Sequence, residues 1–347
     1  MNAAAGNNPN PPGIARVTAV HRDSCTIHDG HTEAGAELLG KLVFNAESPL
    51  DYPAVGDWVL ANFYNGDTFS VIHDILPRKS LLKRKTSGRK VDFQVIAANI
   101  DVAFIVQSVD DNFNLRRLER YLVMVNEGGI RPVVLLSKCD LISSEAARER
   151  VGRIRDIMPQ LHVQPFSSKD SAGMEEVEGL LQPAKTYCLL GSSGVGKTTL
   201  LNRLVGEDVF KTEAVREKDG KGRHVTTRRQ LIRLAGGALV IDTPGMRELG
   251  NFSVEAGLDE TFADIGELAS SCRFSDCTHR SEEGCAVLSA VSDDRLSEDR
   301  YHNYMRMSRE TAYNDMSYLE KRRKDKNFGK FVKTVMKEKK RQKRHSL

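Results

Sequence analysis

The spacing of apolar and polar residues divides the chain into regions with different periodicities. In residues 14–76, short apolar stretches alternate with Gly, Asp, Asn and Pro; the stretches are at 15–20, 40–44, 57–61 and 69–72. This pattern is typical of short strands joined by turns. About five strands with no long helical repeat between them indicate a small closed barrel of the OB type, and a β-sandwich is the alternative.

From residue 86 the pattern changes to alternating strands and helices. Buried-strand runs occur at 102–106, 132–136, 187–190 and 238–241. Helical repeats lie between them, at 115–125, 144–158 and 198–204. This order predicts an α/β domain with a mostly parallel sheet covered on both faces. Beyond residue 250 the apolar strands stop, and a helical segment rich in cysteine follows.

These patterns give an expected domain organisation. We expect a disordered lead-in at 1–13, an OB-like barrel at 14–85, an α/β domain at 86–250, a helical metal-binding domain at 251–319 and a basic tail at 320–347. A chain of 347 residues is long enough for several hydrophobic cores. It contains no apolar run near the about 18 residues that a membrane span needs, and its N-terminus has no leader-like pattern. We therefore expect a cytoplasmic protein with no membrane partner.

Charge is concentrated at the C-terminal end. Residues 320–347 contain thirteen Lys and Arg residues and three acidic residues, whereas the whole chain has a formal charge of only +4. A basic tail on a mildly acidic body favours binding to a polyanion, above all nucleic acid. Phe328 and Phe331 lie among these charges, where they can stack on bases. The alternative is a solvated, charged helix end.

A phosphate-binding loop follows the strand at 187–190 and opens the next helix. Its GxxxxGK[ST] pattern is formed by Gly191, Ser192, Ser193, Gly194, Val195, Gly196, Lys197 and Thr198, with Thr199 directly after it. The glycines let backbone N–H groups point at the α- and β-phosphates, and the helix N-terminus adds partial positive charge. We expect Lys197 to reach the β- and γ-phosphates and Thr198 to ligate Mg²⁺.

Other strand ends carry residues that complete a nucleotide site. Asp242 begins the sequence Asp-Thr-Pro-Gly, in which Asp242 can hold Mg²⁺ through water and the Gly245 N–H can contact the γ-phosphate. Ser137, Lys138, Cys139 and Asp140 occupy the place of the NKxD guanine signature, with Asp140 as the guanine reader. Ser167, Ser168 and Lys169 resemble the SAK element that supports the base carbonyl, and a plain loop is the alternative.

The order of these motifs is unusual. The base-reading segments precede the phosphate loop, whereas most GTPases have the reverse order, so the domain is expected to be circularly permuted. All the contacts lie at one edge of the sheet, and a rotated chain order therefore leaves the site intact.

A charged, Gly-rich segment at 211–230 separates the phosphate loop from Asp242. Thr226 or Thr227 is expected to ligate Mg²⁺ and to sense the γ-phosphate. Met246 stands where a water-orienting Gln is common, which predicts slow intrinsic hydrolysis. His224 is the candidate catalytic residue that orients water, and a surface histidine is the alternative.

Cysteines are clustered beyond residue 270. Cys272, Cys277 and Cys285, with His279, offer three thiolates and one imidazole, a set suited to one structural Zn²⁺ ion. Buried, unliganded cysteines are the alternative. His302, Tyr301 and Tyr304 are expected to be packing or surface residues.

Together the permuted motifs, the barrel and the Cys-x4-Cys-x-His-x5-Cys segment resemble the bacterial ribosome small subunit-dependent GTPase A family over nearly the full chain. The stretch at 222–227 is similar to that family's switch-loop signature. Two positions depart from the family pattern: Ser137 replaces Asn, and Val225 replaces a more typical Thr. The first predicts weaker bracing of the phosphate loop and weaker guanine selectivity.

This resemblance implies a monomeric GTPase that binds GTP and GDP with Mg²⁺, and that contacts the small (30S) ribosomal subunit and its rRNA late in assembly. It implies that hydrolysis occurs on the subunit and that release follows. Two other functions are open at this point. One is a nucleotide-gated RNA-binding scaffold without a need for turnover, and the other is an ATP-dependent P-loop enzyme.

Overall fold

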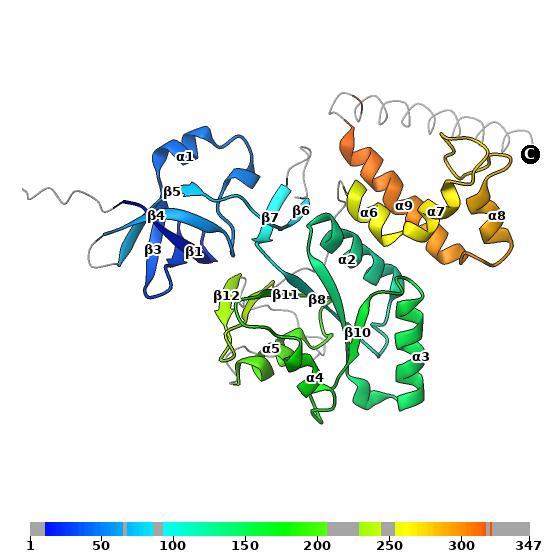
Figure 1. The fold of residues 1–347 in the computed structure, drawn as a ribbon, viewed down its shortest axis with the longest axis horizontal. Coiled ribbons are helices and arrows are strands. Elements are labelled where there is room, and N and C mark those ends of the chain that lie inside the picture. Colours follow the sequence, from blue (N-terminus) through cyan, green and yellow to red (C-terminus); the bar gives the residue numbers. More distant parts are fainter. Residues whose placement is uncertain are drawn as a thin grey trace, which may run out of the picture.

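The computed structural model describes residues 11–64, 68–85, 93–206, 229–243, 254–316 and 320. In Figure 1 a barrel lies at one side of a central α/β sheet, and a group of helices lies at the other. Several predicted residues fall outside the described ranges: His224, Val225, Thr226, Thr227, Gly245, Met246 and the tail beyond Glu320. Among the described helices, none combines the length and the apolar character that crossing a membrane requires.

The N-terminal strands form the predicted barrel. They are β1 (Gly13–Val20), β2 (Cys25–His28), β3 (Glu33–Leu38), β4 (Trp58–Tyr64) and β5 (Phe69–Ile75). Strand β1 pairs with both β2 and β4, and β3 pairs in parallel with β5, so the strands close into a ring. Val17, Ile27, Val59 and Ile72 are fully buried at its centre.

The prediction of a strand at 40–44 was wrong. These residues form helix α1 (Gly40–Asn45), and the short 3₁₀ helix η1 (Pro49–Asp51) follows. In the barrel, β3 already pairs with β2 and β5, and β4 with β1 and β5, so no ladder position remains for another strand. Val43 and Phe44 consequently face solvent, with Phe44 89% exposed.

The central sheet has the order β10-β9-β8-β11-β13-β12. Its strands are β8 (Val102–Ser108), β9 (Arg131–Ser137), β10 (His162–Pro165), β11 (Thr186–Leu190), β12 (Gln230–Arg233) and β13 (Leu239–Asp242). All pairings are parallel except that of β12 with β13. Four of these strands were predicted from apolar runs, β10 was expected only as the strand end before Ser167, and β12 was not predicted.

Helices cover both faces of this sheet, as predicted. The elements are α2 (Leu115–Glu127), η2 (Cys139–Leu141), α3 (Ser144–Arg155), α4 (Met174–Gly179) and α5 (Lys197–Val205). Alternate strand residues separate two cores, one shared with α2 and α3 and the other with α4 and α5. The sheet is therefore a three-layer α/β structure, and the carboxyl ends of its parallel strands share one edge.

The barrel is joined to the sheet by polar and close backbone contacts. β1 meets β12 at the Ala19–Gln230 pair, and the hairpin of β6 (Leu81–Lys85) and β7 (Phe93–Ala98) lies in the connection. The buried Arg16 donates to Thr186 Oγ1 at 2.8 Å. Gly56 has a φ of +92°, and a Cβ there would lie 2.2 Å from the Ala98 carbonyl oxygen, so only glycine fits.

The C-terminal helices pack against α2. They are α6 (Glu255–Thr261), α7 (Ala263–Ala269), α8 (Ala286–Ser292) and α9 (Glu298–Asp315). Helix α6 crosses α2 at Gly257, where an added Cβ would lie 2.1 Å from the Val123 carbonyl oxygen. The Gly257 N–H donates to the Glu127 carboxylate at 3.0 Å. Backbone-to-backbone contact of this kind leaves no room for a larger residue.

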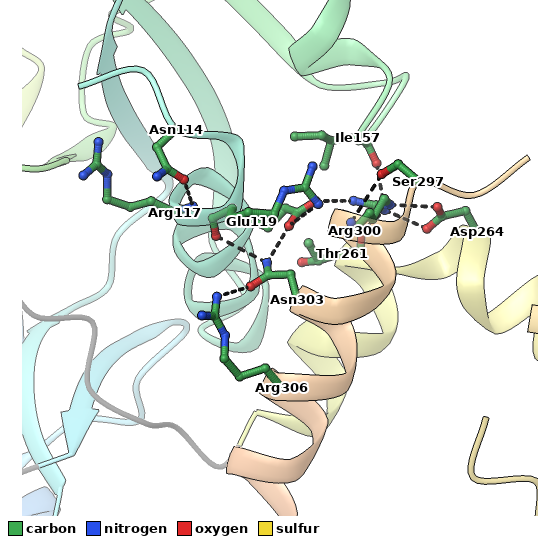
Figure 2. A network of polar contacts seen from close by, with 11 residues as sticks. Asn114, Arg117, Glu119, Ile157, Thr261, Asp264, Ser297, Arg300, Asn303 and Arg306 are labelled. Carbon is green, nitrogen blue, oxygen red and sulfur yellow. Dashed lines mark hydrogen bonds and ion pairs between the residues drawn. The ribbon is translucent and has the colours of Figure 1, made fainter. Parts of the chain in front are cut away.

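A buried ionic network ties α9 to α2 (Figure 2). Arg300 lies at its centre and donates to Glu119 on α2 at 2.8 Å and to both carboxylate oxygens of Asp264 at 2.7 and 2.9 Å. Its guanidinium also bonds to the carbonyl oxygens of Ile157 and Thr261. Burial lowers the pKa of Arg300, but the hydrogen bonds and charges of Asp264 and Glu119 outweigh it, so the pKa lies above its ordinary value.

Replacing Arg300 with Met should lower the free energy of unfolding by about 3–5 kcal/mol, because the buried Glu119 would lose one of its charged partners. Urea denaturation followed by far-UV circular dichroism measures this change. Arg309→Met on the exposed face of the same helix is the matched control and should stay within about 0.5 kcal/mol of wild type. Equal stability of the two variants would contradict the anchoring role of the network.

Candidate nucleotide site and metal centre

The predicted nucleotide-binding segments meet at the carboxyl edge of the parallel strands. The register places Leu189 beside Asp242, Leu190 beside Ile105, and Ser108 beside Ser137. The phosphate loop leaves β11, Asp242 ends β13, and the base-reading segments follow β9 and β10. The topology therefore brings together residues that are about a hundred positions apart in the chain.

The phosphate loop has the backbone needed to surround an anion. Gly194 and Gly196 have φ values of +80° and +97°, and a Cβ on Gly191 would lie 2.4 Å from the Val106 carbonyl oxygen. Helix α5 begins at Lys197, so its N-terminus points into the loop. Lys197 Nζ donates to the Gly191 and Ser192 carbonyl oxygens, each at 2.7 Å. Thr198 and Thr199 form the first turn of α5.

A hydroxyl in this loop has no protein partner within the described part of the chain. Ser192 Oγ is buried and neither donates nor accepts a hydrogen bond within the described residues. Since buried polar groups in native proteins are nearly always paired, such an atom in a phosphate loop fits a ligand oxygen.

Asp242 lies beside the loop. Burial raises its pKa, although the charge of Lys197 and the Thr243 N–H act in the opposite direction. The next residue is anchored, because the buried Thr243 Oγ1 donates to the Leu189 carbonyl oxygen at 2.5 Å. The carboxylate is thus held at the strand end, near enough to Lys197 to respond to its charge.

Ser137 braces the phosphate loop despite its short side chain. Its hydroxyl donates to the Val195 carbonyl oxygen at 2.7 Å and is fully buried with it. The brace, which the sequence predicts to be weaker than one made by Asn, is thus present as a single hydrogen bond. Because the hydroxyl carries one proton, this bond leaves Ser137 with no donor for a base.

The two base-reading segments contact each other directly. Ser167 Oγ donates to Asp140 Oδ1 at 2.9 Å, and the Cys139 N–H donates to the Phe166 carbonyl oxygen at 3.2 Å. Ser167 Oγ also accepts the Lys169 N–H at 3.1 Å, while the Ser168 carbonyl oxygen accepts from Arg203. Burial raises the pKa of Cys139, so its thiol stays protonated at neutral pH.

Residues at the end of β8 join this site and were not among the predicted residues. Asp110 forms an ion pair with Lys138, with a Nζ–Oδ2 distance of 2.8 Å. Ser108 and Asn112 bond to the other oxygen of the same carboxylate. The polar stretch at 107–112, directly after a buried strand run, was the available sequence signal.

The four predicted metal ligands lie together after α7. The ligand atoms of Cys272, Cys277, His279 and Cys285 are all within 4.8 Å of one another. Cys272 Sγ is 3.9 Å from Cys285 Sγ, and His279 Nδ1 lies 3.6 and 3.5 Å from these two sulfurs. The cluster can hold a metal ion.

The surrounding contacts fix the orientation of the cluster. Burial lowers the pKa of His279, which favours the neutral imidazole that metals bind. Tyr301 on α9 donates to the His279 carbonyl oxygen at 2.7 Å. The Glu282 carboxylate accepts N–H groups from Thr278, Arg280 and Ser281, which close the loop between the ligands. Tyr304 packs against Phe262 and His302 is exposed, as predicted.

Comparison with known proteins decides the family. The profile of the RsgA GTPase family matches residues 75–252. The chain belongs to this RsgA GTPase family. A relative from Lactiplantibacillus plantarum, named small ribosomal subunit biogenesis GTPase RsgA 2, is 42% identical over 304 residues, which cover 88% of this chain and 85% of the relative. An RsgA protein from Methanosarcina acetivorans is 39% identical over 90% of this chain and 88% of its own.

Two solved structures have a similar architecture. The crystal structure of YjeQ from Thermotoga maritima matches with a TM-score of 0.64 and 26% identity, covering 87% of this chain and 99% of that one. YloQ, described as a circularly permuted GTPase, matches with a TM-score of 0.62 and 25% identity over 91% of this chain and all of its own. The predicted family, the permuted P-loop GTPase fold and the enzyme class are confirmed.

Proposed function

We propose that this chain is a GTP-hydrolysing switch that binds the small ribosomal subunit during its biogenesis, as the names of its relatives indicate. The observation that carries the proposal is the single edge at which the phosphate loop and both base-reading segments meet. Ser137 joins the base reader to the loop, and Ser167 joins the two base-reading segments. A site whose segments are bonded to each other in this way suits a nucleotide that contacts the phosphate loop and both base-reading segments.

In this proposal the loop from Gly191 to Thr199 surrounds the phosphates, and Lys197 turns from its carbonyl contacts to the β- and γ-oxygens. Thr198 binds Mg²⁺ directly and Asp242 holds it through water, so the ion neutralises phosphate charge. The remaining roles belong to residues outside the described ranges. Gly245 contacts the γ-phosphate, Thr226 or Thr227 completes the Mg²⁺ shell, and His224 orients water.

The proposed guanine reader is Asp140. One of its carboxylate oxygens accepts from Ser167, and the carboxylate as a whole can accept the two donors on the Watson–Crick edge of guanine. Adenine offers no matching pair of donors, which is why GTP is proposed in preference to ATP.

Asp140→Asn should weaken GTP binding by about 100-fold or more, since the new amide N–H₂ would face the two guanine donors and leave them unpaired. The same variant should gain affinity for xanthosine triphosphate, whose C2 carbonyl can accept from the new amide. Competition with a fluorescent nucleotide measures both changes. Asp156→Asn, an exposed carboxylate at the end of α3, should leave both affinities unchanged. Retained GTP preference in the Asp140 variant would rule out this reader.

The proposed metal is Zn²⁺. Four ligands at Zn–S distances of about 2.3 Å and Zn–N distances of about 2.0–2.1 Å around a tetrahedral centre lie about 3.5–3.8 Å apart. The separations among Cys272, His279 and Cys285, which are 3.5, 3.6 and 3.9 Å, are close to these values. Since all four positions are protein ligands, the ion is proposed to be structural.

The proposed partner is the small subunit with its rRNA, and the proposed location is the cytoplasm. The support is the relatives' names and the basic sequence at 320–347. The test is GTP hydrolysis with and without purified small subunits, with ATP and large subunits as controls. A large rise with GTP and small subunits only is expected. No rise would favour the scaffold function, and equal use of ATP would favour an ATP-dependent enzyme.

A further inference from the structure

The turn after β8 holds a carboxylate against the base-reading segment. Asp110 Oδ2 accepts from Lys138 Nζ at 2.8 Å, and the two side chains are 28% and 31% exposed. Asp110 Oδ1 accepts from Ser108 Oγ at 2.6 Å and from the Asn112 N–H at 3.0 Å. Both oxygens are therefore occupied, and the carboxylate has a fixed direction.

Lys138 is also held at its backbone. It has a φ of 61° and a ψ of 33°, the left-handed conformation that residues other than glycine seldom adopt. The Lys138 carbonyl oxygen accepts the Leu141 N–H at 3.0 Å, and the next N–H is bonded to Phe166. A lysine side chain has several rotatable bonds, so it keeps one path only when both its ends are fixed. Here the backbone fixes one end and Asp110 fixes the other.

The same turn lies beside the phosphate loop. A Cβ added to Gly194 would have Asn112 Nδ2 as its nearest neighbour, at 3.9 Å. Burial raises the pKa of Asp110, but the Lys138, Ser108 and Asn112 hydrogen bonds outweigh it, and the pKa lies below its ordinary value. The carboxylate is thus charged at neutral pH, where it pairs with the Lys138 ammonium.

We infer that Asp110 is a positioning residue for the guanine nucleotide: its ion pair holds the Lys138 stem in one path along the base site and keeps the pair neutral. This inference rests on the proposed function, because it concerns the same site. Asp110 acts through Lys138 and does not itself bind the nucleotide. If the Asp110 carboxylate were purely structural, its removal would change the stability of the fold and leave the nucleotide affinity unchanged.

A double-mutant cycle tests the inference with the full-length protein and a fluorescent GDP analogue. Asp110→Asn should raise the Kd by about tenfold, because it frees the Lys138 ammonium. Lys138→Met keeps an unbranched stem but leaves Asp110 unpaired, and it should also weaken binding. In the Lys138→Met background, Asp110→Asn should cause no further loss. The neighbouring exposed Asp111→Asn is the matched control and should leave the Kd unchanged.

Two further measurements separate a positioning role from other roles. Thermal unfolding without nucleotide should give the same midpoint for wild type and Asp110→Asn. Inorganic tripolyphosphate, which has no base, should compete equally well at both proteins. Additive losses in the cycle, an unchanged Kd for Asp110→Asn, or an equal loss of tripolyphosphate binding would each overturn the inference. A wild-type protein that fails to bind GDP would overturn the proposed function as well, whereas the other outcomes leave that function intact.

Discussion

Lys197→Ala should reduce GTP hydrolysis by at least about 100-fold, because removing one preorganised group that stabilises transition-state charge typically costs 10²–10³ in rate. The Lys197 ammonium already lies inside the phosphate loop, 2.7 Å from the Gly191 and Ser192 carbonyl oxygens. Steady-state hydrolysis in the presence of small ribosomal subunits is the measurement.

Lys185→Ala is the matched control for charge. Lys185 forms a half-exposed ion pair with Asp101 at the start of β11, at the opposite end of the strand from the loop. The loss of the Lys185 ammonium should leave the rate of GTP hydrolysis within about twofold of wild type, because exposed ion pairs contribute little to stability. Full subunit maturation by the Lys197 variant, despite lost hydrolysis, would favour the scaffold function over a turnover-dependent switch.

The parts of the fold that sequence could predict are those encoded locally. The runs at 102–106 and 132–136 are continuous and apolar because these strands are buried on both faces, and the structure has them as β8 and β9. The phosphate loop was predictable because glycines and a helix start must follow a strand in fixed order. Neither inference needs knowledge of distant residues.

Short or context-dependent elements could be predicted only in part. Strand β10 has only four residues, His162–Pro165, so the sequence indicated its end before Ser167 but not its extent, which is set by pairing with β9. The apolar run at 40–44 has strand-like composition but forms α1, because the barrel leaves it no partner. In both cases the deciding factor is the pairing of other strands, which is a property of the assembled sheet.

Long-range polar pairs were hidden for the same reason. Glu119 and Arg300 are 181 positions apart, and Asp110 and Lys138 are 28 apart. Taken alone, each of these residues is an ordinary charged residue of a helix or a turn. Only the packing of α9 on α2, and of β8 beside β9, gives these charges their partners and their roles.

If the proposed Zn²⁺ is held by this cluster, Cys285→Ala should abolish its binding and unfold the segment around α7 and α8. Cys285 is both a predicted ligand and the N-cap of α8, with its sulfur accepting the Leu288 N–H at 3.4 Å. Structural Zn²⁺ contributes an apparent binding free energy of about 10–16 kcal/mol in small modules, so losing one of four ligands should be decisive. Metal analysis of the purified protein should fall from one Zn²⁺ per chain to nearly none.

The matched control is Cys25→Ala, because the two thiols are almost equally buried, at 6% and 5% exposure, but Cys25 lies in the barrel. It should retain its metal while losing only the packing of one sulfur. Limited proteolysis should then cut the Cys285 variant between α7 and α8 and leave the Cys25 variant intact there. Since α9 anchors this segment through Tyr301 and the Arg300 network, the α2–α9 contact should survive in both proteins. Full zinc content in the Cys285 variant would show that this thiolate is not a ligand.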